Sequence, residues 1–388
     1  MIDGQRDFYM YSQGEFLAAT STPFPLSAAT RPLYEQVLRR RVADLEGVQL
    51  RGRCQCSTYL ADDGSTTVHG VAIRDQSGEQ EALVADLVVD ATGRTSRTST
   101  WLETHGYTPP ATEELHVDLA YSATLIDRPA DDRRMIGMLA EAPRTRGGAV
   151  LPVEGDRWLV NLHGIHGDHP PTTIEAAREF AASLPSPVFA RFLDEYPQVS
   201  EEIHRYPFAS NRRYHYADLD RFPDGLLVIG DAIASFNPIY GQGMSVAALE
   251  ALMLHQTLAT DDREDRALRF FDRADAVIDP AWMLATGADF SFPQTAGDRP
   301  RGTTLFNWYL DRLLRKAHTD SVLTDAFTRV LSMQHPPSSL LRPGVVWRVL
   351  RPGRSGGHSL PREPPHGQPA HPAETTSARS PRTLETER

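Results

Sequence analysis

One stretch of the chain carries residue types that could hold a ligand at the end of a strand. Residues 225–230 (GLLVIG) form a short apolar run that predicts a buried strand, and Asp231 follows directly. In an open α/β sheet, ligands lie at the carboxyl ends of the strands, where a carboxylate can accept hydrogen bonds from a ribose hydroxyl. Pro238 and the glycines of 241–243 then lead into a predicted helix over 242–258. Glycines let the backbone approach a planar ligand, and a helix N-terminus favours an anionic ligand edge.

The glycines at 241 and 243 half-match the dinucleotide-binding fingerprint, with Val246 in the third position. That fingerprint requires its first glycine directly after a strand, whereas a loop separates Gly241 from the predicted strand. We therefore do not predict a phosphate-binding turn at these glycines.

The segment 225–250 resembles the second FAD-contact motif of the aromatic-hydroxylase-like flavoprotein monooxygenases, which share the p-hydroxybenzoate hydroxylase fold. The resemblance implies that Asp231 binds the FAD ribose and that Pro238 lies beside the isoalloxazine ring. It also implies that the loop 241–244 faces the pyrimidine end of the flavin, where the helix dipole stabilises negative charge on the reduced form. The FAD contacts implied in this segment are Gly230, Asp231, Pro238, Gly241, Gln242, Gly243 and Met244.

A second segment resembles the other FAD signature of the same family. Residues 83–90 (LVADLVVD) predict a strand buried on both faces of a parallel sheet, and Thr92, Gly93, Ser96 and Arg97 follow it. Thr92 stands where the family usually has Asp. The resemblance implies that Thr92 and Gly93 contact FAD, with Gly93 near the pyrophosphate, and that Arg97 adds positive charge.

A third feature is Arg31, which begins a predicted amphipathic helix over 31–46. In the family an arginine at this place lies over the FAD phosphates. The resemblance extends over residues 25–350 and includes likeness to a bacterial subgroup of epoxidases and hydroxylases.

The order of these segments predicts an α/β fold, α+β overall. The two buried strands enclose short alternating runs that predict an antiparallel sheet, so we expect a split FAD-binding Rossmann-like domain with an inserted substrate domain and C-terminal helices. The expected segments are 1–112 (FAD-binding domain, first part), 113–215 (substrate domain), 216–285 (FAD-binding domain, second part), 286–351 (helical region) and 352–388 (disordered tail).

The family begins with a βαβ unit whose G-x-G-x-x-G turn binds the FAD pyrophosphate. This sequence has no such motif after a strand near its start. We therefore expect an incomplete first segment, and weak or absent FAD binding by the chain as written.

The resemblance implies a flavin-dependent monooxygenase. Such an enzyme would hydroxylate or epoxidise a hydrophobic small molecule through a C4a-hydroperoxyflavin, with NAD(P)H as the reductant. The alternatives are a flavin-dependent reductase or dehydrogenase, and a halogenase, although the sequence contains no W-x-W-x-I-P stretch. A non-catalytic binding protein with a hydrophobic pocket is a further alternative.

Composition limits the partners. A net charge of −11 argues against a nucleic-acid surface, and no apolar run approaches the roughly 18 residues that span a bilayer. The first residues do not form a signal peptide, and Cys54 and Cys56 are the only cysteines, so we expect a cytoplasmic protein without a disulfide. The sequence does not indicate an oligomeric state.

Two side-chain groups carry weaker hypotheses. His163, His166, Asp168 and His169 could ligate a metal, as in a metallohydrolase, but they are out of step with the binuclear H-x-H-x-D-H pattern, and we predict no metal site. The two cysteines are predicted to be packed side chains rather than nucleophiles, because no histidine partner is identifiable.

Overall fold

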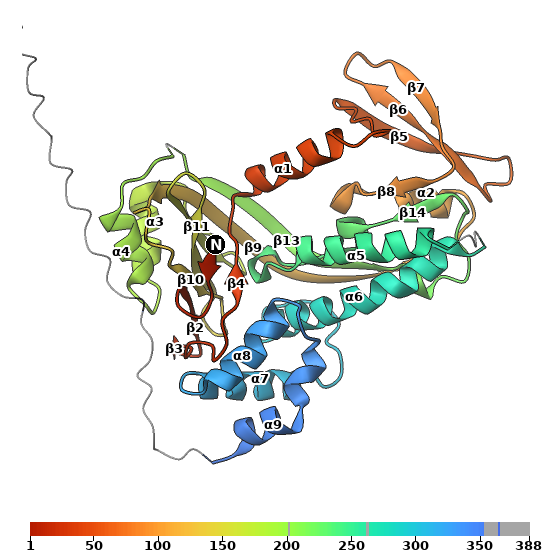
Figure 1. Cartoon of the computed structure of the whole chain (residues 1–388). Coiled ribbons are helices and arrows are strands. Elements are labelled where there is room, and N and C mark those ends of the chain that lie inside the picture. Colours follow the sequence, from red (N-terminus) through yellow and green to blue (C-terminus); the bar gives the residue numbers. More distant parts are fainter. Residues whose placement is uncertain (201, 261–263, 353–363, 365–388) are drawn as a thin grey trace, which may run out of the picture.

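The protein is described by a computed structural model, which describes residues 1–200, 202–260, 264–352 and 364 (Figure 1). A long antiparallel sheet runs through the middle, with a strand-rich region at one end and a group of helices along one side. This arrangement confirms the predicted α/β fold with an antiparallel insertion. Among the described residues, no helix has both the length and the apolar character needed to cross a membrane.

The largest sheet has eight strands in the order β15-β13-β9-β12-β11-β10-β2-β3. All neighbours pair antiparallel except β10 and β2, which run parallel. The predicted antiparallel sheet is therefore confirmed. Its strands are β2 (Phe8–Ser12), β3 (Glu15–Phe16), β9 (Ala111–Asp127), β10 (Met135–Met138), β11 (Arg146–Val153), β12 (Arg157–Gly164), β13 (His204–His215) and β15 (Ala234–Ser235).

The beginning of the chain belongs to this sheet. Strand β2 pairs with β10, and β3 pairs with β2. Residues 8–16 thus lie apart from the rest of the predicted first segment, 1–112, because their strands find partners in the inserted sheet. A separate two-stranded pair joins β1 (Ile2–Asp3) to β4 (Pro25–Leu26). The division into domains otherwise stays a prediction.

The predicted strand over 83–90 is wrong in its extent. The structure divides it into β7 (Gln80–Val84), which lies in an antiparallel sheet with β5 (Cys54–Ala61) and β6 (Val68–Asp75), and β8 (Val88–Asp90). Strand β8 does pair in parallel, as predicted for a strand of a parallel sheet, and its partner is β14 (Leu226–Val228). Burial on both faces is also wrong, since Val84 is 81% exposed and Val89 is 39% exposed.

The helices follow the predicted pattern closely. The predicted helix over 242–258 is α5 (Gly243–Leu258), and the predicted helical region 286–351 is helical over 303–317, 321–331 and 343–350. Over the described residues the α-helices are α1 (Arg31–Ala43), α2 (Thr98–Thr104), α3 (Ile174–Ala182), α4 (Val188–Glu195), α5, α6 (Arg266–Asp289), α7 (Thr303–Ala317), α8 (Ser321–Leu331) and α9 (Pro343–Leu350). The predicted disordered tail, 352–388, lies outside the described residues except for residues 352 and 364.

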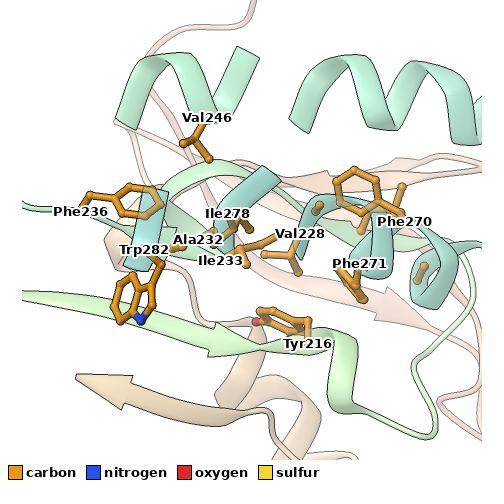
Figure 2. Close-up of a cluster of buried hydrophobic side chains, with 14 of the residues drawn as sticks. Tyr216, Val228, Ala232, Ile233, Phe236, Val246, Phe270, Phe271, Ile278 and Trp282 are labelled. Atoms are coloured by element: carbon orange, nitrogen blue, oxygen red, sulfur yellow. The ribbon is translucent and has the colours of Figure 1, made fainter. Parts of the chain in front are cut away.

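Apolar packing fixes the position of the β14 turn (Figure 2). Val228 at the end of β14 and Ile233 just beyond it are buried in one cluster with aromatic side chains of α6. Phe271 of α6 stacks on Tyr216, with ring centroids 5.0 Å apart. Because these side chains are fully enclosed, the strand end and the following turn have a rigid foundation.

Candidate functional site

The two segments predicted to contact FAD meet at the carboxyl ends of the parallel strands β8 and β14. Gly93 and Gly230 begin the turns that follow these strands, and both have positive φ, +68° and +69°. A Cβ on Gly93 would lie 3.6 Å from the Cβ of Asp231, so the two turns are in contact. The structure therefore brings Gly93 of one sequence motif together with Gly230 and Asp231 of the other.

Asp231 keeps a carboxylate available for a ligand. The carboxylate oxygens of Asp231 make no hydrogen bond or ion pair with any other residue that the structure describes. Partial burial raises the pKa of its carboxyl, and the positive charges of Arg94 and Arg31 oppose that shift. A free acceptor at the end of a parallel strand suits a ribose hydroxyl.

Thr92 is exposed, but its hydroxyl and its backbone N–H are both used within the turn. Its backbone N–H donates to Oδ1 of Asp90 at 2.9 Å, and its hydroxyl donates to the same oxygen at 2.5 Å. The hydroxyls of Ser96 and Thr98 each donate to Oδ2 at 2.6 Å. Burial alone would raise the pKa of Asp90, but the hydrogen bonds from Ser96, Thr92 and Thr98 outweigh it and lower the pKa. Asp90 thus organises the turn, a role that the sequence reasoning did not assign.

Arg94 is the arginine of this turn that reaches inward. Its guanidinium donates to the carbonyl of Ser210 at 2.8 Å and also hydrogen-bonds the hydroxyl of Ser235. It lies 4.8 Å from the ring centre of Phe208. Burial, followed by the neighbouring Arg212, lowers the pKa of Arg94. Sequence reasoning selected Arg97 instead, because Arg97 matched the family motif.

The other two predicted arginines lie at the surface. Arg97 is exposed, next to the first residue of α2. Arg31 begins α1, pairs with Glu35 at 2.9 Å and is close enough to Asp231 to affect its pKa. Arg31 therefore lies within electrostatic reach of Asp231, which belongs to one of the paired turns.

The loop before α5 is open on one side and contacts the interior of the protein on the other. Gly241 has φ +71°, and a Cβ built on Gly241 or on Gly243 would meet no atom within 4 Å. Gln242 between them is buried, and its amide donates to the carbonyl of Leu331 at 3.3 Å. Met244 is 60% exposed. The glycines thus leave open space beside the loop, while Gln242 points into the protein, away from the predicted flavin side.

A buried polar network holds this loop in place. Asp289, at the end of α6, accepts hydrogen bonds from the amides of Asn211 and Asn237 at 2.7 and 3.0 Å and from the hydroxyl of Tyr240 at 2.7 Å. Burial raises the pKa of Asp289 to about 6 against these three hydrogen bonds. Since Asn237 and Tyr240 flank Pro238, the network fixes the residue predicted to lie beside the flavin ring.

A cavity of about 390 Å³ lies between the loop 238–241 and one face of the eight-stranded sheet. Strand β12 contributes Leu159, Asn161 and His163, which alternate along the strand and so share one face. This volume is in the range of small-molecule binding sites. The further lining residues are Phe8, Met10, Tyr121, Met135, Ile136, Gly137, Met138, Leu139, Gly148, Ala149, Leu151, Pro238, Ile239, Tyr240, Gly241 and Leu331.

The four residues that were considered as metal ligands, for which no metal site was predicted, have separate partners in the structure. Asp168 pairs with Arg146 at 2.7 Å, and His169 lies 3.0 Å from the carboxylate of Asp118. His163 is buried in the wall of the cavity. Within the ranges that the structure describes, no group of three or more His, Cys, Asp or Glu side chains could hold a metal ion.

Cys54 and Cys56 are free thiols on β5 and are both exposed. The prediction that they are packed side chains is therefore wrong. The strand lies in the small outer sheet with β6 and β7, where the residues of its first half remain in contact with solvent.

The arrangement fits a flavin nucleotide. Glycines leave room beside the loop at 241–243, Asp231 offers a free acceptor, and no side chain caps the N-terminus of α5, so its first N–H groups can face a ligand. Gly93 and Asp231 would hold the nucleotide end of FAD, and Pro238 and the glycine loop would hold its ring.

Comparison with known proteins leads to the same class. A family described as "FAD binding domain" matches residues 11–280, which is more than half of the chain. The chain is 30% identical over 348 residues to "Protein Rv3254" of Mycobacterium tuberculosis, covering 86% of this chain and 73% of that protein. The chain belongs to this family of aromatic-hydroxylase-like, FAD-dependent oxidoreductases.

Two solved structures share the fold. A flavoprotein/dehydrogenase from Cytophaga hutchinsonii has a TM-score of 0.60 and 15% identity, covering 88% of this chain and 79% of that one. The structure of pqsL, a probable FAD-dependent monooxygenase from Pseudomonas aeruginosa, has a TM-score of 0.52 and 17% identity, covering 74% of this chain and 79% of that one.

Proposed function

We propose that this FAD-dependent oxidoreductase is a monooxygenase that hydroxylates or epoxidises a hydrophobic small molecule and takes its electrons from NAD(P)H. The observation that carries this proposal is the apolar cavity next to Pro238 and Gly241. The family resemblance implies that the flavin ring lies at that same loop, so a molecule in the cavity would lie beside it. The likeness to a probable monooxygenase points the same way.

FAD, when bound, supplies the redox chemistry and the activation of oxygen. The residues of the chain position the reactants. The Asp289 network holds Asn237 and Tyr240, and with them the loop that forms one wall of the cavity. The other wall is the sheet face that includes Leu159. The apolar side chains of this face would keep water away from the reacting atoms.

Isotope labelling tests the proposal. The purified chain, with FAD in excess, is incubated with NAD(P)H, ¹⁸O₂ and a panel of aromatic and alkene compounds. We expect a product that is heavier by one labelled oxygen atom and NAD(P)H consumption that rises when substrate is added. FAD is supplied in excess because the sequence predicts weak or absent FAD binding. Titrating the chain with FAD tests that prediction separately.

Other outcomes contradict oxygen insertion. A product that has lost hydrogen and carries no label would indicate a dehydrogenase, and a halide-dependent product would indicate a halogenase. Ligand binding without any electron transfer from NAD(P)H would indicate a binding protein.

A further inference from the structure

A second cavity of about 330 Å³ is enclosed by strand β2, the loop after β10 and the helices α6, α7 and α8. It shares a wall with the cavity beside the flavin loop, because Met10, Leu139, Tyr240 and Leu331 line both. Of the residues expected to contact FAD, only Gln242 lines the second cavity. The space therefore lies beyond the candidate flavin site and has no ligand assigned to it.

Helix α7 turns one face toward this cavity. Asn307, Leu310, Asp311, Leu314 and Arg315 line it, and their spacing of three and four residues places them on the same side of the helix. Leu314 is buried, Asp311 is half-buried and Arg315 is exposed. The cavity thus has an apolar interior and a charged edge.

The interior is apolar on the side opposite α7 as well. Leu284 of α6 and the side chains of Phe327 and Val330 of α8 line it, and the last two are buried. A ligand with an apolar body would remove these side chains from water, which favours its binding. The volume is within the range of small-molecule sites.

Asp311 has one carboxylate oxygen that a ligand can reach. Its Oδ1 accepts a hydrogen bond from the side-chain amide of Gln13 at 3.1 Å. Its Oδ2 makes no hydrogen bond or ion pair with any other residue that the structure describes. This oxygen is not enclosed by protein atoms, since it keeps accessible surface. Because Asp311 lines the cavity, a donor placed there can approach Oδ2.

The nearest positive charge does not neutralise Asp311. Arg315, one turn further along α7, donates to Oε1 of Gln13 at 3.1 Å and makes no ion pair with Asp311. Burial raises the pKa of the Asp311 carboxyl, and the charge of Arg315 opposes this shift only in part. A cation close to the carboxylate would compensate for the hydration that burial removes.

The second acid at this edge is already used within the protein. Glu141 accepts hydrogen bonds from the hydroxyl of Ser12 and, at 2.8 Å, from the N–H of Gln13, and it lies 3.6 Å from Arg144. The described side chains that line the cavity include two carboxylates and one guanidinium, so the lining is acidic. It attracts a cation and repels an anion.

We propose that this second cavity binds a small molecule with an apolar body and one ammonium group, in which the ammonium group pairs with Oδ2 of Asp311. The body packs between α6, α7 and α8. A neutral hydroxyl can donate to the same oxygen, but a hydrogen bond between two charged groups is roughly twice as strong. The proposal goes beyond the proposed function, because binding requires neither flavin nor turnover.

Three probes with one apolar body test the proposal. 4-Phenylbutylamine is a cation, 4-phenylbutan-1-ol is neutral and 4-phenylbutyrate is an anion. Calorimetric titration of the full-length chain at neutral pH and low ionic strength should show the amine binding about three- to tenfold more tightly than the alcohol, and the anion binding most weakly. Equal binding of amine and alcohol, or tighter binding of the anion, would overturn the proposal.

A matched variant assigns the preference to Asp311. Asp311→Asn keeps the size of the side chain and an acceptor for Gln13 but removes the charge. It should abolish the preference for the amine and leave binding of the alcohol within about twofold. The control is Asp298→Asn, the same change at an exposed position outside both cavities, which should keep the preference. A preference that survives in Asp311→Asn contradicts the assignment.

A second variant locates the probes. Leu310 lines this cavity and not the cavity beside the flavin loop. Leu310→Trp fills the space from α7, so binding of all three probes should be lost. Binding of the amine that persists in Leu310→Trp would show that the probe occupies another site.

Arg315→Gln covers the case in which either of these variants fails to fold, because Arg315 is exposed. Removal of the positive charge next to Asp311 should tighten binding of the amine about two- to fivefold and leave the alcohol unchanged. An unchanged or weaker affinity for the amine would contradict pairing with the carboxylate.

Discussion

At the scale of single residues, Gly93 is required by the shape of the backbone. Its φ of +68° lies in the left-handed region, which costs a side chain about 1 kcal/mol. Gly93→Ala should therefore lower the free energy of unfolding by about 1 kcal/mol and weaken FAD binding at the neighbouring Asp231. Urea unfolding and FAD titration measure the two effects. Gly52→Ala is the control, since Gly52 does not have a positive φ and a Cβ built on it would meet no atom within 4 Å. Equal stability of the two variants would contradict the argument.

Glu250 gives the protein a pH dependence near neutrality. This carboxyl is fully buried, Oε2 accepts the N–H of Gly230 at 2.7 Å, and Oε1 has no partner among the described residues. Burial raises its pKa from about 4.5 to about 7, although the hydrogen bond from Gly230 opposes the shift. The folded state thus keeps a proton that the unfolded chain releases, so its stabilising effect is complete below pH 4.5 and is lost as pH rises through 7.

Glu250→Gln removes this titration and keeps an acceptor for Gly230. Relative to the variant, the unchanged protein should lose up to about 3 kcal/mol of unfolding free energy between pH 4.5 and 7.5. Chemical denaturation of both proteins across that range measures the difference. A difference that is constant with pH would show that Glu250 does not titrate there.

At the scale of elements, α1 and α6 use their apolar residues differently. None of the residues of α1 is buried, and Leu38 is 58% exposed. In α6, Phe271 is 1% exposed and packs in the core beneath the β14 turn (Figure 2). The sequence pattern of α1 predicts an amphipathic helix, but Figure 1 shows this helix standing apart from the main sheet.

Alanine substitutions measure this difference. Leu38→Ala should change the free energy of unfolding by less than about 0.5 kcal/mol, because little apolar contact is lost. Phe271→Ala should cost about 3–5 kcal/mol, because it empties a closely packed space. Thermal denaturation of the two variants compares them. A large loss for Leu38→Ala would mean that α1 is packed against the protein in solution.

At the scale of the whole molecule, Asp289 joins three parts of the fold. Its carboxylate accepts hydrogen bonds from Asn211 of the large sheet and from Asn237 and Tyr240 of the loop before α5, while Asp289 itself ends α6. Asp289→Ala leaves three donors without their acceptor, two of them fully buried, and should cost about 3 kcal/mol or more. Asp289→Ala should also weaken the binding of a small apolar molecule in the cavity, since the loop that Asp289 holds forms part of the cavity wall.

Thermal unfolding and calorimetry measure the two consequences for Asp289. Asp298→Ala, the same change at an exposed position, is the matched control and should stay within about 0.5 kcal/mol of the unchanged protein. If both variants behave alike, the network does not stabilise the junction between the sheet, the loop and the helices.

Much of the architecture could be predicted from local patterns. The alternating runs over 113–215 form an antiparallel sheet, and the glycine-rich segment precedes helix α5, as expected. The single predicted strand over 83–90 failed because an apolar run does not reveal where the chain passes from one sheet to another. Pairing of β2 with β10 depends on residues more than a hundred positions away, which local patterns do not contain.

The sequence by itself determined the class of protein and the two turns that meet at the nucleotide end of the candidate site. These depend on Gly93, Gly230 and Asp231, whose residue types are needed wherever the backbone must adopt positive φ or present an acceptor. Only the tertiary structure decided which polar side chains are used within the protein and which remain free for a ligand. It engaged the hydroxyl of Thr92 with Asp90 and left the carboxylate of Asp231 without a partner among the described residues. The physical reason is that hydrogen-bond partners and burial come from residues far apart in the chain, and packing alone brings them together.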